Sequence, residues 1–60
     1  MNIVKAVTTD VGYTLIDNKG NTKWVSSLDF QNEILAKHKI RGIKKNENKQ
    51  WVYILKEKKS

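Results

Sequence analysis

The sequence predicts an α+β fold, in which a small antiparallel sheet carries one helix across one face. Three observations predict it: strand-like runs separated by turn residues over the first 26 residues, one amphipathic segment, and two further strand-like runs. The element order is then β-β-β-α-β-β. Sixty residues suffice for one domain. We expect it to span residues 1–56, with a frayed basic tail at residues 57–60.

The first three strands are expected to form two hairpins. Residues 2–9 are rich in β-branched side chains, residues 11–17 alternate in polarity, and residues 22–25 form a third short run. Gly12 and Gly20 each end a turn-like cluster, where glycine accepts a positive φ that other residues avoid. The first half of the chain therefore reads as a meander.

The register of the second hairpin has two interpretations. A three-residue loop pairs Tyr13 with Val25, whereas a four-residue loop pairs Tyr13 with Trp24. A one-residue slip exchanges the two faces of a strand. Trp24 can therefore lie either in the core or on the surface, depending on the register.

A single helix is expected from Ser26 to about Lys39. A serine hydroxyl can cap the free amides, and Asp29 adds negative charge to the first turn. The apolar stripe expected to face the sheet comprises Leu28, Phe30, Ile34, Leu35 and His38. His38, the only histidine, is expected to be a packed structural residue.

The segment around Gly42 allows two interpretations. Gly42 can end the helix as a left-handed residue, or residues 40–45 can form a fourth strand. We favour the strand, because residues 46–49 resemble a turn and residues 50–56 form a strong strand. This hairpin would set Gly42 opposite Tyr53.

The last strand is apolar on both faces, which is typical of a central strand. Val52 in this strand and Ile34 in the helix are expected in the core. The element order is shared with the OB barrel, a fold that often binds oligonucleotides. Because the chain is short for a closed barrel, an open sheet is the prediction.

The positive charge lies in the second half of the chain. Residues 1–30 carry three lysines and three aspartates, whereas residues 31–60 carry nine cations and three glutamates, which accounts for the whole net charge of +6. Such asymmetry favours an anionic partner, either nucleic acid or an acidic protein surface. A charge of this size is also ordinary for a soluble small domain.

The candidate binding residues are the second-half cations and one aromatic side chain. Isoleucines are expected to anchor the basic segment at residues 37–45 while its cations face solvent. Trp24 is the aromatic residue most expected to be exposed, as a base-stacking platform or a protein hot spot. The full set is Lys37, Lys39, Arg41, Lys44, Lys45, Lys49, Lys56 and Trp24. The competing interpretation is an edge strand guarded by lysines against aggregation.

The residue types needed for catalysis or metal binding are scarce. There is no cysteine, one histidine and no clustered carboxylates or phosphate-binding glycine run. We therefore expect no enzyme, cofactor, metal or small-molecule substrate. The longest apolar run, Trp51–Leu55, is far shorter than the ~20 residues that cross a bilayer. With no signal-peptide pattern at the start, a soluble cytoplasmic protein without a membrane partner is expected; a homodimer stays open.

The sequence therefore predicts a non-enzymatic binding protein that engages nucleic acid through its basic second half. Eleven of the twelve cations are lysine, and the exception is Arg41. Since arginine is the usual reader of guanine, recognition should be backbone-directed and weakly sequence-specific. The lysine and asparagine excess also resembles small bacteriophage or mobile-element proteins, or the codon usage of an AT-rich genome. The alternative is accordingly a phage- or mobile-element-encoded protein that inhibits or redirects an acidic host protein.

Overall fold

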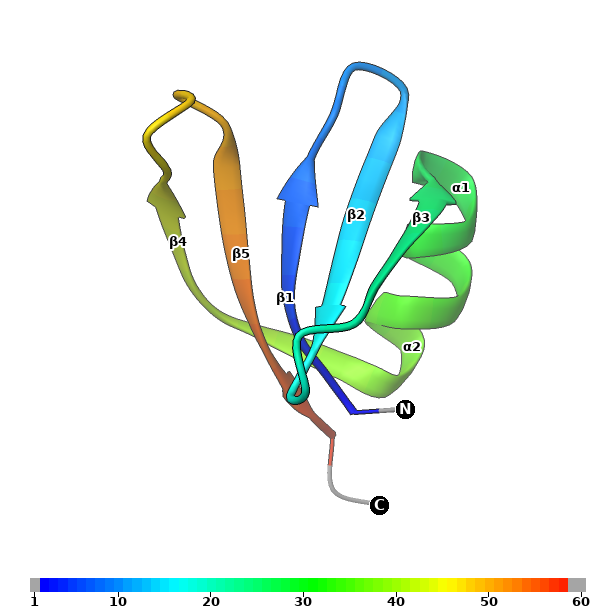
Figure 1. The fold of residues 1–60 in the computed structure, drawn as a ribbon. Coiled ribbons are helices and arrows are strands. Elements are labelled where there is room, and N and C mark those ends of the chain that lie inside the picture. Colours follow the sequence, from blue (N-terminus) through cyan, green and yellow to red (C-terminus); the bar gives the residue numbers. More distant parts are fainter. Residues whose placement is uncertain (1, 59–60) are drawn as a thin grey trace.

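Five strands form one open antiparallel sheet, with a helix packed against part of one face (Figure 1), which confirms the predicted fold class. The computed structural model describes residues 2–58. The strands are β1 Ile3–Thr8, β2 Gly12–Asp17, β3 Thr22–Ser26, β4 His38–Lys45 and β5 Trp51–Glu57. Their order is β3-β2-β1-β5-β4, so β3 and β4 form the two edges and the sheet does not close into an OB barrel. In the part of the chain that the structure describes, no helix is long and apolar enough to cross a membrane.

The helix begins after a serine cap and ends earlier than expected. It comprises α1 (Ser27–Asp29), a π-helical turn η1 (Phe30–Ile34) and α2 (Leu35–Lys37). Ser26 Oγ accepts a hydrogen bond from the Asp29 amide at 3.2 Å, which confirms the serine cap. His38 is already extended (φ −134°, ψ 150°), because it pairs with Glu57 of β5. Pairing in the sheet thus removes His38 from the predicted helix.

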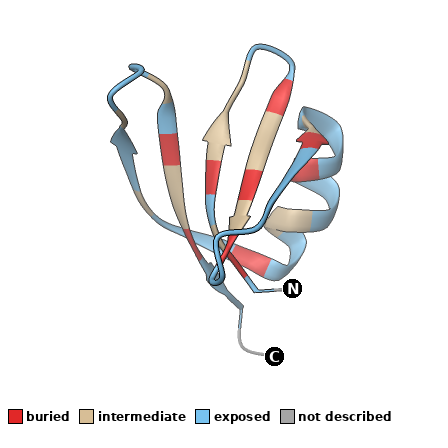
Figure 2. Cartoon of the chain, in the orientation of Figure 1, coloured by how far each residue is buried: buried red, intermediate tan, exposed pale blue. Residues whose placement is uncertain are grey.

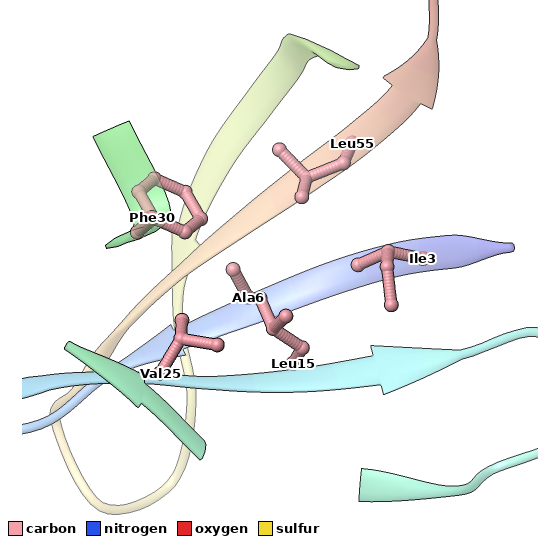
Figure 3. Packing of buried hydrophobic residues seen from close by; sticks show 6 residues of the cluster. All are labelled: Ile3, Ala6, Leu15, Val25, Phe30 and Leu55. Atoms are coloured by element: carbon pink, nitrogen blue, oxygen red, sulfur yellow. The ribbon is translucent and has the colours of Figure 1, made fainter. Parts of the chain in front are cut away.

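One apolar cluster joins the helix to the sheet (Figure 3). Its buried members are Ile3, Ala6, Leu15, Val25, Phe30 and Leu55. Tyr13 stacks on Phe30 with ring centroids 3.8 Å apart, and Tyr53 lies beside both rings. Burial, and then the neighbouring Tyr53 phenol, raise the pKa of the Tyr13 hydroxyl. The core therefore lies between the helix and the middle strands (Figure 2).

One of the expected core positions is corrected. Leu28 is 65% exposed, because two residues along a helix are about 200° apart and Phe30 faces the sheet. Val52 is buried, as expected, although it lies outside the helix-side cluster. Ile34 is half-buried against that cluster, as expected.

The two hairpins of the first half are present, and the register is the first of the two alternatives. Tyr13 pairs with Val25, and Thr14 pairs with Trp24. Tyr13 and Val25 therefore face the helix, and Trp24 faces away from it.

The two glycines of these hairpins serve different purposes. Gly20 has φ +87° in the β2–β3 turn, as expected. Gly12 does not have a positive φ, so the expected left-handed turn residue is wrong. A Cβ at Gly12 would lie 2.2 Å from the Val25 carbonyl oxygen and 2.7 Å from the Trp24 ring. A glycine is thus required at position 12 because β3 approaches the β2 backbone too closely there for any side chain.

The Asp17 carboxylate organises the β2–β3 turn. Its Oδ1 accepts hydrogen bonds from the Lys19 amide (2.9 Å) and the Asn21 amide (2.8 Å), and its Oδ2 accepts one from Asn21 Nδ2 (3.1 Å). Burial of the carboxylate opposes ionisation, but these hydrogen bonds outweigh burial and hold the pKa of Asp17 below its usual range.

We expect Asp17→Asn to lower the urea midpoint at neutral pH, since an amide nitrogen replaces one accepting oxygen. The stabilisation by ionised Asp17 should be complete above its unfolded pKa of ~3.9 and disappear as the pH falls through the lower folded pKa. Parent and variant should therefore converge in acid. Asp10→Asn, in the exposed β1–β2 turn, is the control. A pH-independent difference between parent and D17N would contradict this role.

The second half forms the predicted hairpin with a different register. β4 contains a bulge at Arg41, so that Ile40 pairs with Leu55 and Gly42 with Ile54. The expected pairing of Gly42 with Tyr53 is wrong, because the turn sets Asn46 opposite Gln50 and thereby Gly42 opposite Ile54; the bulge changes the register only beyond Arg41, towards His38.

The end of the chain is paired further than predicted. Glu57 is part of β5, and the Lys58 amide donates to the Lys37 carbonyl at 2.8 Å. The frayed tail expected from residue 57 therefore does not begin there. Residues 59–60 lie outside the described residues.

Candidate nucleic-acid interface

The sheet topology keeps the two halves of the chain apart. Strands β1, β2 and β3 form one side of the sheet, and β5 and β4 form the other (Figure 1). The second-half cations therefore gather along two adjacent strands and the turns at their ends. β4 is an edge strand whose side chains beyond its first residue are mostly exposed (Figure 2). The charge asymmetry of the sequence thus becomes an asymmetry in space.

The open face is the side of the sheet opposite the helix. Successive side chains of a strand alternate between faces, and residues paired across antiparallel strands share a face. The register therefore places two rows of side chains on the open face, each crossing all five strands. From β4 to β3 these rows are Lys44, Val52, Val7, Thr14, Trp24 and Gly42, Ile54, Lys5, Ile16, Thr22.

The centre of the open face is apolar. Val52 is 4% exposed, and Val7, Ile16 and Ile54 are half-buried. These four side chains lie on neighbouring strands, so they form a continuous apolar strip. No part of the helix packs on this strip, because the helix-side cluster consists of the alternate residues. Val7, Ile16 and Ile54 are therefore partly accessible to a ligand, whereas Val52 offers almost no accessible surface.

The Trp24 side chain is held in place at the β3 end of the open face. Its ring packs against the backbone of Gly12, a buried residue without a side chain. Its indole Nε1 donates to Thr9 Oγ1 at 3.4 Å. The residue is nevertheless 51% exposed, so part of the ring faces solvent. Trp24 is thus an ordered, accessible aromatic surface.

One lysine lies among the apolar side chains of the strip, and others lie beside it. Lys5 lies between Ile54 and Ile16 in the second row, and Lys44 ends the first row. Lys39 and Lys56 pair directly across β4 and β5. Like charges in this position destabilise a sheet, and an anion bound between them would offset the repulsion.

The Lys39–Lys56 pair borders a hollow of about 220 Å³ at the same end of the hairpin. The hollow, called the basic hollow below, is lined by Lys39, Lys56, Glu57 and Lys58. Three of these four lining residues are lysines and one is a glutamate. The basic hollow therefore suits a single anionic group such as a phosphate.

The structure brings together only some of the predicted binding residues. Lys39, Lys44, Lys56 and Trp24 lie on the open face by their register. The others lie elsewhere: Lys37 in the last turn of the helix, Arg41 in the bulge, Lys45 on the helix side of β4 and Lys49 in the β4–β5 turn. Sequence spacing could not show this division because the bulge at Arg41 changes the alternation along β4.

The expected isoleucine anchors of the basic segment are wrong. Ile40 is 42% exposed and Ile43 is 56% exposed. The reason is the position of β4 at the edge, beyond the reach of the helix. Ile43, Trp51 and Tyr53 instead line a shallow groove of about 320 Å³ on the helix side, with Lys45 Nζ 4.8 Å from the centroid of the Trp51 ring.

Lys5 is the site residue that sequence reasoning missed. It lies in the neutral first half, so charge counting placed it outside the patch. The available signal was its position as the one charge inside an apolar strand, Ile3–Thr8. A lone charge in such a strand indicates the face that is not packed on the core.

His38 is buried beside a second groove, between the helix and the sheet. Its Nδ1 lies 2.9 Å from the Ile34 carbonyl, which can only accept, so Nδ1 carries the proton. The groove is about 470 Å³, and Lys23, Asn32, Glu33 and Lys37 supply its other polar side chains. Among the described lining residues there is no hydroxyl or thiol side chain.

In the two rows, the open face offers lysine ammonium groups, the Trp24 ring, the hydroxyls of Thr14 and Thr22, and apolar surface. Within residues 2–58, no group of three or more histidine, aspartate or glutamate side chains lies so that it could hold a metal ion. The arrangement can attract an anion and stack on a planar group. Comparisons with protein-family models, with curated proteins and with solved structures found no match to this chain.

Proposed function

We propose that this chain is a non-enzymatic protein that binds nucleic acid on the open face, chiefly through the phosphate backbone. The observation that carries the proposal is the convergence of Lys5, Lys44 and Trp24 on the one sheet face that the helix leaves uncovered. The basic hollow adds a place for a phosphate group. The proposal implies that the protein works where nucleic acid is accessible, in the cytoplasm of a cell or of a host.

Recognition of sequence is expected to be weak. The only arginine, Arg41, lies in the bulge of the edge strand. Lysine acts on phosphate as a point charge and does not read a base edge with two parallel hydrogen bonds. Different oligonucleotide sequences should therefore bind with similar affinity.

Titration of labelled oligonucleotides at several salt concentrations tests the proposal. The logarithm of the binding constant should fall linearly with the logarithm of the salt concentration. If the four lysines of the open face each neutralise one phosphate of a single strand, the slope should be about −3. Absence of binding at ~50 mM salt would reject nucleic acid as the partner.

A second candidate function is inhibition or redirection of an acidic host protein. The groove of Ile43, Trp51 and Tyr53 favours it, since exposed aromatic residues beside a cation are common at protein hot spots. A pull-down from bacterial lysate, repeated after nuclease treatment, separates the two functions. A stoichiometric protein that survives nuclease, and is lost in Trp51→Ala, would support the inhibitor.

A further inference from the structure

We propose that the ligand of the open face is a single-stranded nucleic acid whose unpaired bases lie on the apolar strip and stack on Trp24. This inference rests on the proposed function and specifies its ligand. It concerns which chemical surface of the nucleic acid meets the protein.

The apolar centre of the open face distinguishes a single strand from a duplex. A duplex presents phosphates and sugars outward and buries the faces of its bases, so docking it would place charged groups against Val7, Ile16 and Ile54. Covering charged groups with apolar side chains costs free energy without a compensating partner. An unpaired base presents an apolar face that fits Val7, Ile16 or Ile54, while its phosphate can reach Lys5 between them or Lys44 at the end of the row.

Trp24 is arranged as a stacking partner before any ligand binds. The Trp24 ring packs against the Gly12 backbone, and its indole Nε1 donates a hydrogen bond to Thr9 Oγ1. A ring that is already ordered loses little conformational entropy when a base stacks on it. Stacking tolerates any base because every base has a π face, which agrees with the weak sequence dependence expected of lysine contacts.

The dimensions of the open face suit a short stretch of single-stranded nucleic acid. Trp24 on β3 and Lys44 on β4 end one row that crosses five strands (Figure 1). At ~4.8 Å between strands the row is ~19 Å long, measured along the sheet. A base whose face lies on the strip is wider than the ~3.4 Å between stacked bases, so the row holds fewer nucleotides than the roughly six that a stacked strand of this length would contain.

The test compares a labelled oligo-dT of about 12 nucleotides with a hairpin duplex that has the same number of phosphates. The single strand should bind at least about tenfold more tightly at equal salt. Trp24→Ala should weaken single-strand binding by about 5- to 150-fold, the range found for one stacked base. Trp51→Ala is the matched control, since Trp51 is similarly exposed (48%) but lies on the helix side.

Fluorescence gives a second readout that does not depend on truncating Trp24. In a Trp51→Phe protein the remaining emission is that of Trp24, and oligo-dT should quench it. In a Trp24→Phe protein the emission of Trp51 should not change. Quenching confined to the first protein supports stacking on Trp24.

The outcomes separate this inference from the proposed function. Equal or tighter binding of the duplex, or full single-strand affinity in a folded Trp24→Ala protein, would overturn the inference and leave nucleic-acid binding intact. Failure of both oligonucleotides to bind at ~50 mM salt would overturn the proposed function itself.

Discussion

The double variant Lys5→Glu, Lys44→Glu is expected to bind an oligonucleotide on the order of 100-fold more weakly than the parent. Both side chains are exposed on the open face, so each reversal replaces attraction by repulsion. A surface ion pair contributes ~0–1 kcal/mol. Because each reversal removes one attraction and adds one repulsion, it should weaken the binding free energy by about twice that amount. The salt slope should also decrease in magnitude by about 1.4, or about 0.7 for each phosphate of a single strand that the variant no longer neutralises.

The matched control is Lys19→Glu, Lys23→Glu. Lys19 lies in the β2–β3 turn, and Lys23 faces the helix side of the sheet because it pairs with Leu15. Both double variants carry the same reduced net charge, so a difference between them reports position on the molecule. Equal weakening in the two variants would mean that overall charge, and no particular surface, attracts the nucleic acid.

The variant Gly12→Ala is expected to destabilise the fold by about 3 kcal/mol, at the upper end of the usual cost of overpacking. The new methyl group would meet the Val25 carbonyl oxygen, which is backbone and cannot rotate away, and also the Trp24 ring. Strands β2 and β3 would have to separate, and the Trp24 ring would move away from residue 12. Chemical denaturation measures the first effect, and Trp24 emission in a Trp51→Phe protein measures the second.

Gly42→Ala is the matched control for Gly12→Ala. Gly42 also lies on the open face, but its φ is not positive and no described atom lies within 4 Å of a Cβ built there. Alanine should leave the midpoint unchanged or raise it slightly, since it narrows the unfolded ensemble by ~0.4–1 kcal/mol. An unchanged midpoint in Gly12→Ala would show that β3 does not approach β2 as closely as described.

Much of the fold was predictable from local patterns. The serine cap ends one strand and begins the helix, and Gly20 marks a turn that requires a positive φ. Both signals act within a few residues, which is why they can be read from the sequence. The end of the helix was not predictable in this way, because His38 fits the helical stripe equally well and only its pairing with Glu57 decides between helix and strand.

The candidate site was predictable only in part. Trp24 and Lys44 were expected at a binding surface, whereas Lys5 was assigned to the neutral half. Charge counting along the chain finds which segments are basic. It does not find which side chains share a face, since that depends on register and on the bulge at Arg41.

The sequence by itself determined the order of the elements, the positions of the turns and the confinement of the excess positive charge to the second half of the chain. These properties follow from side-chain periodicity, turn residues and composition, which are local. The tertiary structure alone decided that β5 pairs with β1, that Trp24 rests on Gly12 and that Lys5 joins the lysines of the second half. The physical reason is that strand pairing joins residues far apart in sequence, and a shift of one residue moves every side chain of a strand to the opposite face.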